Sequence, residues 1–187
     1  MKTTKTLIAC AAMALLSGCM TITGEPRHEH TLYEDPEPVG AEHPLYQSIS
    51  VSPAADFKGT SIITLSGRVS PNLSDDSFTE LLNDTLKSAN LLGDGYTLEA
   101  RLIDGGGWGL FKGRVVALGP LKRTVVIHYV VTNSNGEVVY DREITAVGEF
   151  TSYNAMRSYY LTERRVAEAG YRANLEALVA DLKALKG

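Results

Sequence analysis

From residue 45 onward, apolar and polar residues alternate along several segments of the chain. This period of two predicts half-buried β-strands, and it occurs in residues 45–51, 61–69, 96–102, 123–133 and 138–150. Asn135-Gly136 separates the last two segments, and this dipeptide tolerates the positive φ angles of a tight turn. The pattern therefore predicts a long antiparallel hairpin in the second half of the chain.

Two other segments space their apolar residues three and four positions apart, which predicts amphipathic helices. Ser74 is a suitable N-cap for the first helix, which should end before Gly93. The second helix begins between residues 154 and 162 and runs to the end of the chain. The order strand, strand, helix, three strands, helix predicts an α+β fold. We expect a mostly antiparallel sheet of about four to five strands, with two helices packed on one face.

The N-terminus has a different pattern. Two lysines precede an apolar run at residues 7–16, and two small residues then precede Cys19. These are the charged, apolar and cleavage regions of an export signal, which we assign to residues 1–18. The apolar run is too short to span a bilayer as a helix, since that takes about 20 apolar residues.

The tetrapeptide Leu16-Ser17-Gly18-Cys19 resembles the lipobox of bacterial lipoproteins. The resemblance implies that the chain is cut before Cys19 and that Cys19 is the lipidation site. It would carry a diacylglyceryl group and an N-acyl chain, which together anchor a protein stably in a membrane. The alternative is an ordinary secretory signal, cut near Ala12 or Ala14, which would leave a free thiol at Cys19.

The resemblance also implies a location. In bacterial lipoproteins an aspartate after the lipidated cysteine is an inner-membrane retention signal, and this chain has Met20 there. We therefore expect sorting to the outer membrane, with the domain facing the periplasm and exposure at the cell surface as the open alternative.

The composition fits one folded domain. Without the signal the chain has roughly 170 residues, close to the usual length of one domain. Cys10 leaves with the signal, so that Cys19 is the only remaining cysteine and no intramolecular disulfide can form. Apolar residues make up 44% of the chain and charged residues 21%, which is ordinary for a protein with a packed core. We assign residues 45–187 to this single α+β domain.

Residues 19–44 have the composition of a linker. Residues 20–44 hold six acids against one arginine, together with four prolines and few apolar side chains. Such a segment cannot bury enough apolar surface to offset the entropy lost on ordering. It predicts a flexible, acidic tether that carries the lipid at Cys19 and holds the domain clear of the membrane.

Histidines in this tether suggest a metal site at first sight. His28, Glu29, His30 and His43 are of the residue types that bind zinc. A stable site also needs ligands held in a preformed geometry, which a flexible segment does not provide. We therefore expect no metal ion and no cofactor.

A glycine-rich segment at residues 105–114 holds the only tryptophan of the chain beside basic residues. It is not a phosphate loop, because the Gly-Lys-Ser/Thr ending is missing. Aromatic anchors with a basic rim suit a lipid interface, an anionic glycolipid or a protein partner. The candidate partner-binding or lipid-binding residues are Trp108, Leu110, Phe111, Lys112, Arg114, Lys122 and Arg123. The alternative is that the rings fold back and close one end of the core.

Residues 153–160 are a second candidate for docking. They are rich in tyrosine and include Met156, and both residue types are favoured in interfaces. Core packing by Tyr159 or Tyr160 is the alternative for this segment.

No catalytic constellation is visible in the sequence. The patterns Gly-x-Ser-x-Gly, His-Glu-x-x-His and Ser-x-x-Lys are all missing. His128 lies in the middle of a predicted strand with no acid or nucleophile near it in sequence, so we interpret it as a hydrogen-bonding surface residue rather than a catalyst.

The whole element order is similar to that of small α/β lipoproteins of Gram-negative envelopes. These include the lipopolysaccharide-assembly lipoprotein LptE and the auxiliary lipoproteins of ABC-type lipid transporters. The resemblance implies a non-enzymatic accessory or structural role in the cell envelope, with a membrane protein or a lipid as partner and no nucleic acid. A periplasmic carrier of a small apolar ligand is the alternative, and an envelope enzyme is less favoured.

Overall fold

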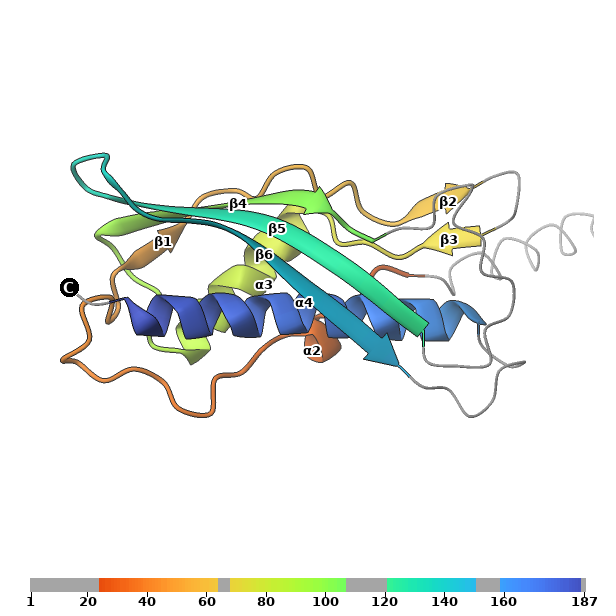
Figure 1. The fold of residues 1–187 in the computed structure, drawn as a ribbon, viewed down its shortest axis with the longest axis horizontal. Helices are drawn as coiled ribbons and strands as arrows, with labels where there is room; N and C mark the ends of the chain where they lie inside the picture. Colours follow the sequence, from red (N-terminus) through yellow and green to blue (C-terminus); the bar gives the residue numbers. More distant parts are fainter. Residues whose placement is uncertain (1–23, 64–67, 107–120, 151–158, 186–187) are drawn as a thin grey trace, which may run out of the picture.

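The computed structural model describes residues 24–63, 68–106, 121–150 and 159–185, which form an α+β fold (Figure 1). Its main sheet has the strand order β1 (Ile49–Val51), β4 (Tyr96–Asp104), β5 (Leu121–Asn133) and β6 (Val138–Phe150). The pairs β4–β5 and β5–β6 are antiparallel, whereas β1 runs parallel to β4. The predicted α+β class is confirmed, and the sheet is mixed because of this one parallel pair.

The predicted strand at residues 61–69 is wrong in one respect. The structure has two short strands there, β2 (Ser61–Ile63) and β3 (Arg68–Ser70), which pair with each other in an antiparallel two-stranded sheet. Alternation of apolar and polar residues predicts extended backbone but not the partner of a strand. This part of the chain therefore lies beside the main sheet and not in it (Figure 1).

The helix predicted after Ser74 is α3 (Asp75–Ser88). The Ser74 side chain accepts a hydrogen bond from the backbone N–H of Ser77, and two acids in the first turn favour this helix end. The apolar face of α3 is fully inside the core, with Phe78, Leu81, Leu82 and Leu86 each at most 1% exposed.

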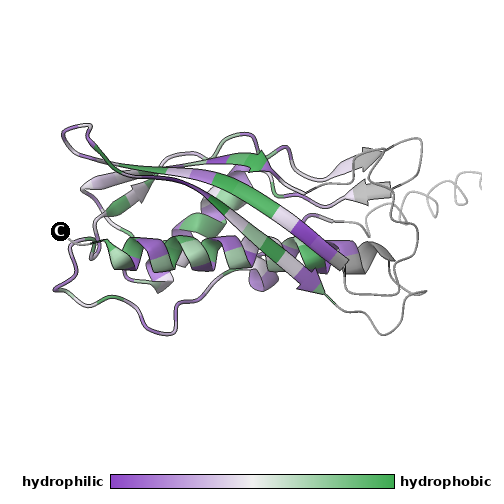
Figure 2. Cartoon of the chain, in the orientation of Figure 1, coloured by the Kyte–Doolittle hydropathy of each residue, from purple (hydrophilic) through white to green (hydrophobic). Residues whose placement is uncertain are grey.

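The hairpin of β5 and β6 forms as predicted around Asn135-Gly136, and Gly136 adopts a φ of 80°. Alternate residues of β5 point to the helical side, where Val125, Ile127, Tyr129 and Val131 are buried. They meet α4 (Tyr159–Ala184), the second predicted helix. Apolar and polar bands alternate along α4 in Figure 2, because only one face of the helix contacts the sheet.

One polar side chain is buried between α4 and the sheet. Asn174 accepts a hydrogen bond from the Tyr129 hydroxyl at 2.9 Å and donates one to the Ile144 carbonyl at 2.8 Å. Burial raises the pKa of Tyr129 well above its ordinary value, so the hydroxyl stays a neutral donor. These bonds fix the position of α4 along the strands.

The prediction that residues 20–44 form a flexible tether is wrong for residues 24–44. This segment contains α2 (His28–Thr31) and lies against α3 and α4 (Figure 1). Thr31 and Val39 are buried, as is Leu45 just beyond the segment. A few well-spaced apolar anchors are therefore enough to order an acidic segment when its charges also find partners.

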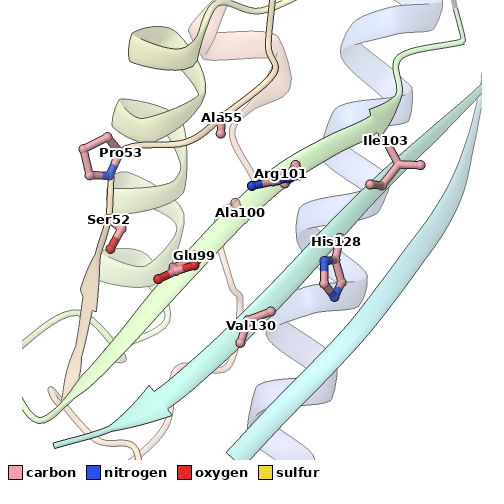
Figure 3. Close-up of a pocket in the computed structure, with 9 residues that line it drawn as sticks. All are labelled: Ser52, Pro53, Ala55, Glu99, Ala100, Arg101, Ile103, His128 and Val130. Atoms are coloured by element: carbon pink, nitrogen blue, oxygen red, sulfur yellow. The ribbon is translucent and has the colours of Figure 1, made fainter. Parts of the chain in front are cut away.

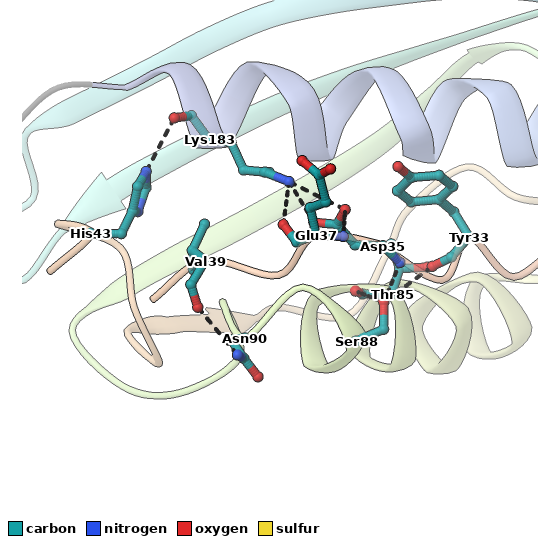
Figure 4. A network of polar contacts seen from close by, with 9 residues as sticks. All are labelled: Tyr33, Asp35, Glu37, Val39, His43, Thr85, Ser88, Asn90 and Lys183. Atoms are coloured by element: carbon teal, nitrogen blue, oxygen red, sulfur yellow. Dashed lines mark hydrogen bonds and ion pairs between the residues drawn. The ribbon is translucent and has the colours of Figure 1, made fainter. Parts of the chain in front are cut away.

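The partner of the acidic segment is Lys183, near the C-terminal end of α4 (Figure 4). Its ammonium group lies 2.9 Å from a carboxylate oxygen of Asp35 and donates to the carbonyl of Glu37 at 2.6 Å. The backbone N–H of Asp35 in turn donates to Ser88 of α3. The segment is thus bonded to both long helices.

Within the described part of the chain, no helix is both long enough and apolar enough to cross a membrane.

Candidate functional site

The face of the main sheet opposite α3 and α4 carries an open groove of about 540 Å³, which we call the outer groove (Figure 3). It is formed by the segment after β1 and by β4 and β5. Its lining residues are Ser52, Pro53, Ala55, Glu99, Ala100, Arg101, Ile103, His128 and Val130. Successive residues of a strand point to opposite faces, which is why Leu98 and Ile127 of the same strands lie in the core.

Backbone hydrogen bonds hold one wall of the outer groove in place. The N–H of Ser52 donates to the carbonyl of Leu98, and the N–H of Ala55 donates to the carbonyl of Ala100. Just beyond this wall, the ring of Phe57 stacks on that of Phe78 at a centroid distance of 4.1 Å in the core. The wall is therefore a rigid continuation of the sheet rather than a loose loop.

Charges of both signs line the groove and its border. Arg101 and His128 are cross-strand neighbours on β4 and β5. The guanidinium of Arg101 lies 3.6 Å from a carboxylate oxygen of Asp56, and Nε2 of His128 lies 2.6 Å from Oδ1 of Asp141 on β6. Exposed pairs of this kind contribute little to stability. Their main consequence is a surface on which each cation has an acid beside it.

Apolar side chains are exposed on the same face. Ile103 in the groove is 50% exposed, and Val147 on β6 is 51% exposed. Val130 also lines the groove and is the cross-strand neighbour of Glu99. Scattered exposed apolar residues are normal on protein surfaces. Here they lie with ion-pairing groups on one sheet face, which is the mixed character of protein-binding surfaces.

Lys122 and Arg123 were expected to share a basic rim, and the structure separates them. Lys122 is exposed and lies 3.0 Å from a carboxylate oxygen of Glu149, its cross-strand neighbour. Arg123 points to the opposite face and is only 6% exposed. Adjacent residues of a strand face opposite sides, so the prediction of Arg123 as a surface-binding residue is wrong.

Arg123 has a structural role. Its guanidinium donates hydrogen bonds to the carbonyl of Gly105 and to the side chain of Asn72, which also accepts one from the Tyr171 hydroxyl. Burial lowers the pKa of Arg123, and burial likewise raises the pKa of Tyr171 to about 12. The guanidinium remains a cation that ties the ends of β4 and β5 to the segment after β3.

The remaining candidates lie outside the described residues. These are Cys19, Trp108, Leu110, Phe111, Lys112 and Arg114, together with residues 153–158 of the tyrosine-rich segment. Their roles stay predictions.

Of the residues at the candidate site, the sequence analysis discussed only His128, and it missed the charged and exposed residues around it, such as Arg101, Ile103 and Asp141. A signal existed for Asp141, because a turn at Asn135-Gly136 fixes which residues of β5 and β6 face each other. His128 is paired with Glu143 in this register, and Asp141 is its diagonal neighbour. Nothing in the order of residues pointed to Arg101 or Ile103, because a charged residue and a single exposed apolar residue are both common on the solvent side of an ordinary strand.

The groove is suited to recognition by hydrogen bonds, ion pairs and apolar contact. His128 and Asp141 form a pair of the kind that activates a nucleophile in hydrolases. Among the described residues, no hydroxyl or thiol side chain is hydrogen-bonded to His128. The pair therefore offers a polar contact point on an exposed surface.

No protein-family model matches this sequence, and comparison with curated proteins gave no match. Solved structures with a similar arrangement include a "putative lipoprotein" from Caulobacter crescentus, at 14% identity and a TM-score of 0.49 over 74% of this chain and 90% of that one. A minor lipoprotein from Acinetobacter baumannii has 13% identity and a TM-score of 0.41 over 73% of this chain and 94% of that one. At this level of likeness, the function must be argued from the residues of this chain.

Proposed function

We propose that this protein is a lipid-anchored lipoprotein of the bacterial outer membrane that acts as a non-enzymatic accessory component and binds an envelope protein. The anchor rests on Leu16-Ser17-Gly18-Cys19, the tetrapeptide that resembles a lipobox. The binding role rests on one observation, the outer groove with its paired charges and exposed apolar residues.

The charges favour a protein over an anionic lipid as the partner. Anionic headgroups are recognised by clusters of lysine and arginine. The outer groove has Arg101 and His128, but Asp56 and Asp141 lie beside them and Glu99 lines the groove itself. This balance of signs is complementary to a protein surface that also has both signs.

A carrier of small apolar molecules is the weaker alternative. Pockets for such ligands are mostly lined by hydrophobic side chains and bury most of the ligand. The outer groove is open, and Glu99, Arg101 and His128 line it. An apolar ligand would leave these charged groups without complementary contacts.

The anchor is tested by Cys19→Ala. We expect the variant to leave the membrane fraction and become extractable without detergent, because it cannot carry the acyl chains. Thermal unfolding of the domain should be unchanged, since the core lies beyond residue 30. Fractionation with and without detergent measures the first outcome, and continued retention in the membrane would contradict the lipoprotein assignment.

The partner is tested by placing a photocrosslinking amino acid at Ile103 in the lipidated protein in its own envelope. We expect one envelope protein to be captured reproducibly. The same amino acid at Asn135, which lies in the hairpin turn far along β5 from the groove, is the matched control and should not capture it. Arg101→Glu should reduce the capture at Ile103 at least about tenfold, because it places a like charge against the partner's acids.

Two outcomes would contradict the binding proposal. Crosslinks at Ile103 only to lipid would favour a surface-binding or carrier role. Equal capture at Ile103 and Asn135 would show that the outer groove has no specific partner.

A further inference from the structure

Three side chains that can bind a metal ion meet between α2 and α3. They are His28 at the start of α2 and two acids of α3, Glu80 and Asp84. One ligand atom from each lies within 4.8 Å of the other two, and Nε2 of His28 is 3.0 Å from Oδ2 of Asp84. We propose that this group, the His28 cluster, binds a zinc ion.

The distances suit zinc. Tetrahedral Zn²⁺ holds histidine nitrogen and carboxylate oxygen at about 2.0–2.2 Å, which places neighbouring ligand atoms roughly 3.4 Å apart. His28 and Asp84 are already close to that spacing, and a carboxylate oxygen of Glu80 lies within 4.8 Å of both ligand atoms. The cluster faces solvent, so water supplies the fourth ligand.

The segment that carries His28 is held in place by contacts outside the cluster. The backbone N–H of Arg27 donates to Oε1 of Glu168 on α4 at 3.0 Å, and Thr31 is buried. The carboxylate of Glu25 accepts a hydrogen bond from the backbone N–H of Ser74 at 2.6 Å. The objection that His28 belongs to a flexible tether therefore does not apply, and little ordering is needed for binding.

The two acids give an electrostatic reason for a cation at this position. Glu80 and Asp84 are four residues apart on α3, where like charges repel each other and weaken a helix. Among the ion pairs of the described residues, the only partner of either acid is His28. A divalent cation would remove this repulsion and join α2 to α3.

The ligand set also selects among metals. One imidazole with two carboxylates suits zinc and related transition metals, whereas Mg²⁺ and Ca²⁺ prefer a set made of oxygen atoms alone. Binding would clamp the chain nine positions after Cys19 to the folded domain. The site is independent of the outer groove and of any partner there.

The test is a calorimetric titration of ZnCl₂ into the full-length protein, purified in detergent and freed of metal with a chelator. We expect one zinc ion per chain. His28→Gln, Glu80→Gln and Asp84→Asn should each raise the Kd at least about tenfold. His30→Gln is the matched control, because His30 lies on the same short helix but outside the cluster, and its Kd should be unchanged.

Thermal unfolding supplies a second readout that separates loss of binding from loss of fold. At a zinc concentration about 100 times the Kd, the wild type should gain roughly 5–10 °C in Tm, and Asp84→Asn should gain nothing. In the presence of a chelator, Glu80→Gln should be at least as stable as the wild type, because it removes the repulsion between Glu80 and Asp84. Absence of stoichiometric binding, or equal Kd values for His28→Gln and the wild type, would overturn the proposal.

Discussion

Replacement of Gly148 by alanine is expected to destabilise the protein by about 3 kcal/mol, at the upper end of the usual cost of overpacking. Gly148 lies on β6 and faces α4 at close range. A Cβ atom added there would be 2.3 Å from the backbone nitrogen of Gly170 and 2.3 Å from the carbonyl oxygen of Val166. Both are backbone atoms of α4, so no side chain can rotate away, and the helix itself must move from the sheet.

Denaturant unfolding measures this cost, and two variants calibrate it. Val147→Ala changes the neighbouring residue, which points to solvent, and should alter the free energy of unfolding by no more than about 0.5 kcal/mol. Gly170→Ala should cost less than Gly148→Ala, because the nearest atom to its Cβ would be in the side chain of Val125, at 2.9 Å, and the backbone atoms of Arg123 and Gly148 would lie at an ordinary contact distance of 3.5 Å. Alanine also favours the helix. A Gly148→Ala variant as stable as Val147→Ala would show that α4 does not approach β6 as described.

Local sequence patterns were sufficient to predict most of the long strands and helices. The period of two identified β4, β5 and β6, since each buries one face and exposes the other. The capping serine Ser74 and the spacing of apolar residues after it identified α3. Asn135-Gly136 identified the hairpin, because few other residue pairs adopt the required backbone angles.

Features that depend on contacts between distant residues could not be obtained in this way. Periodicity carries no information on strand direction, so the parallel pairing of β1 with β4 was not predicted. The same limit applies to β2 and β3, which pair with each other and not with the main sheet. In both cases the missing information is the partner of a strand, and that lies elsewhere in the chain.

The candidate site likewise has features that local sequence patterns predict and features that depend on residues far apart in the chain. The alternation that places Lys122 and Arg123 on opposite faces was already visible in the sequence, and a stricter use of it would have removed Arg123 from the candidates. The outer groove needed the structure, because its wall at residues 52–55 joins β4 from a position far away in sequence.

Composition alone predicted that the acidic segment at residues 24–44 is flexible. It does not show that Lys183 of α4 forms an ion pair with Asp35 in this segment. Lys183→Met tests this ion pair and is expected to cost roughly 2–3 kcal/mol in the stability of residues 33–40, since it leaves the buried carboxylate of Asp35 without its cation. The hydrogen bond from the backbone N–H of Glu37 to this carboxylate remains. The cost should stay below that of a fully buried pair, because the Lys183 side chain is 29% exposed and solvent screens part of the interaction. Amide hydrogen exchange of Asp35, Glu37 and Val39 should become at least about tenfold faster, by local opening of this segment.

Two variants separate the ion pair from a general effect of losing a lysine. Lys87→Met removes an exposed lysine of α3 and should leave exchange of residues 33–40 unchanged. Adding Asp35→Asn to Lys183→Met should recover most of the lost protection, because no buried charge then lacks a partner. If Lys183→Met leaves exchange as slow as in the wild type, the buried residues Thr31, Val39 and Leu45 hold the segment without the ion pair, and the charge of Asp35 has no part in ordering it.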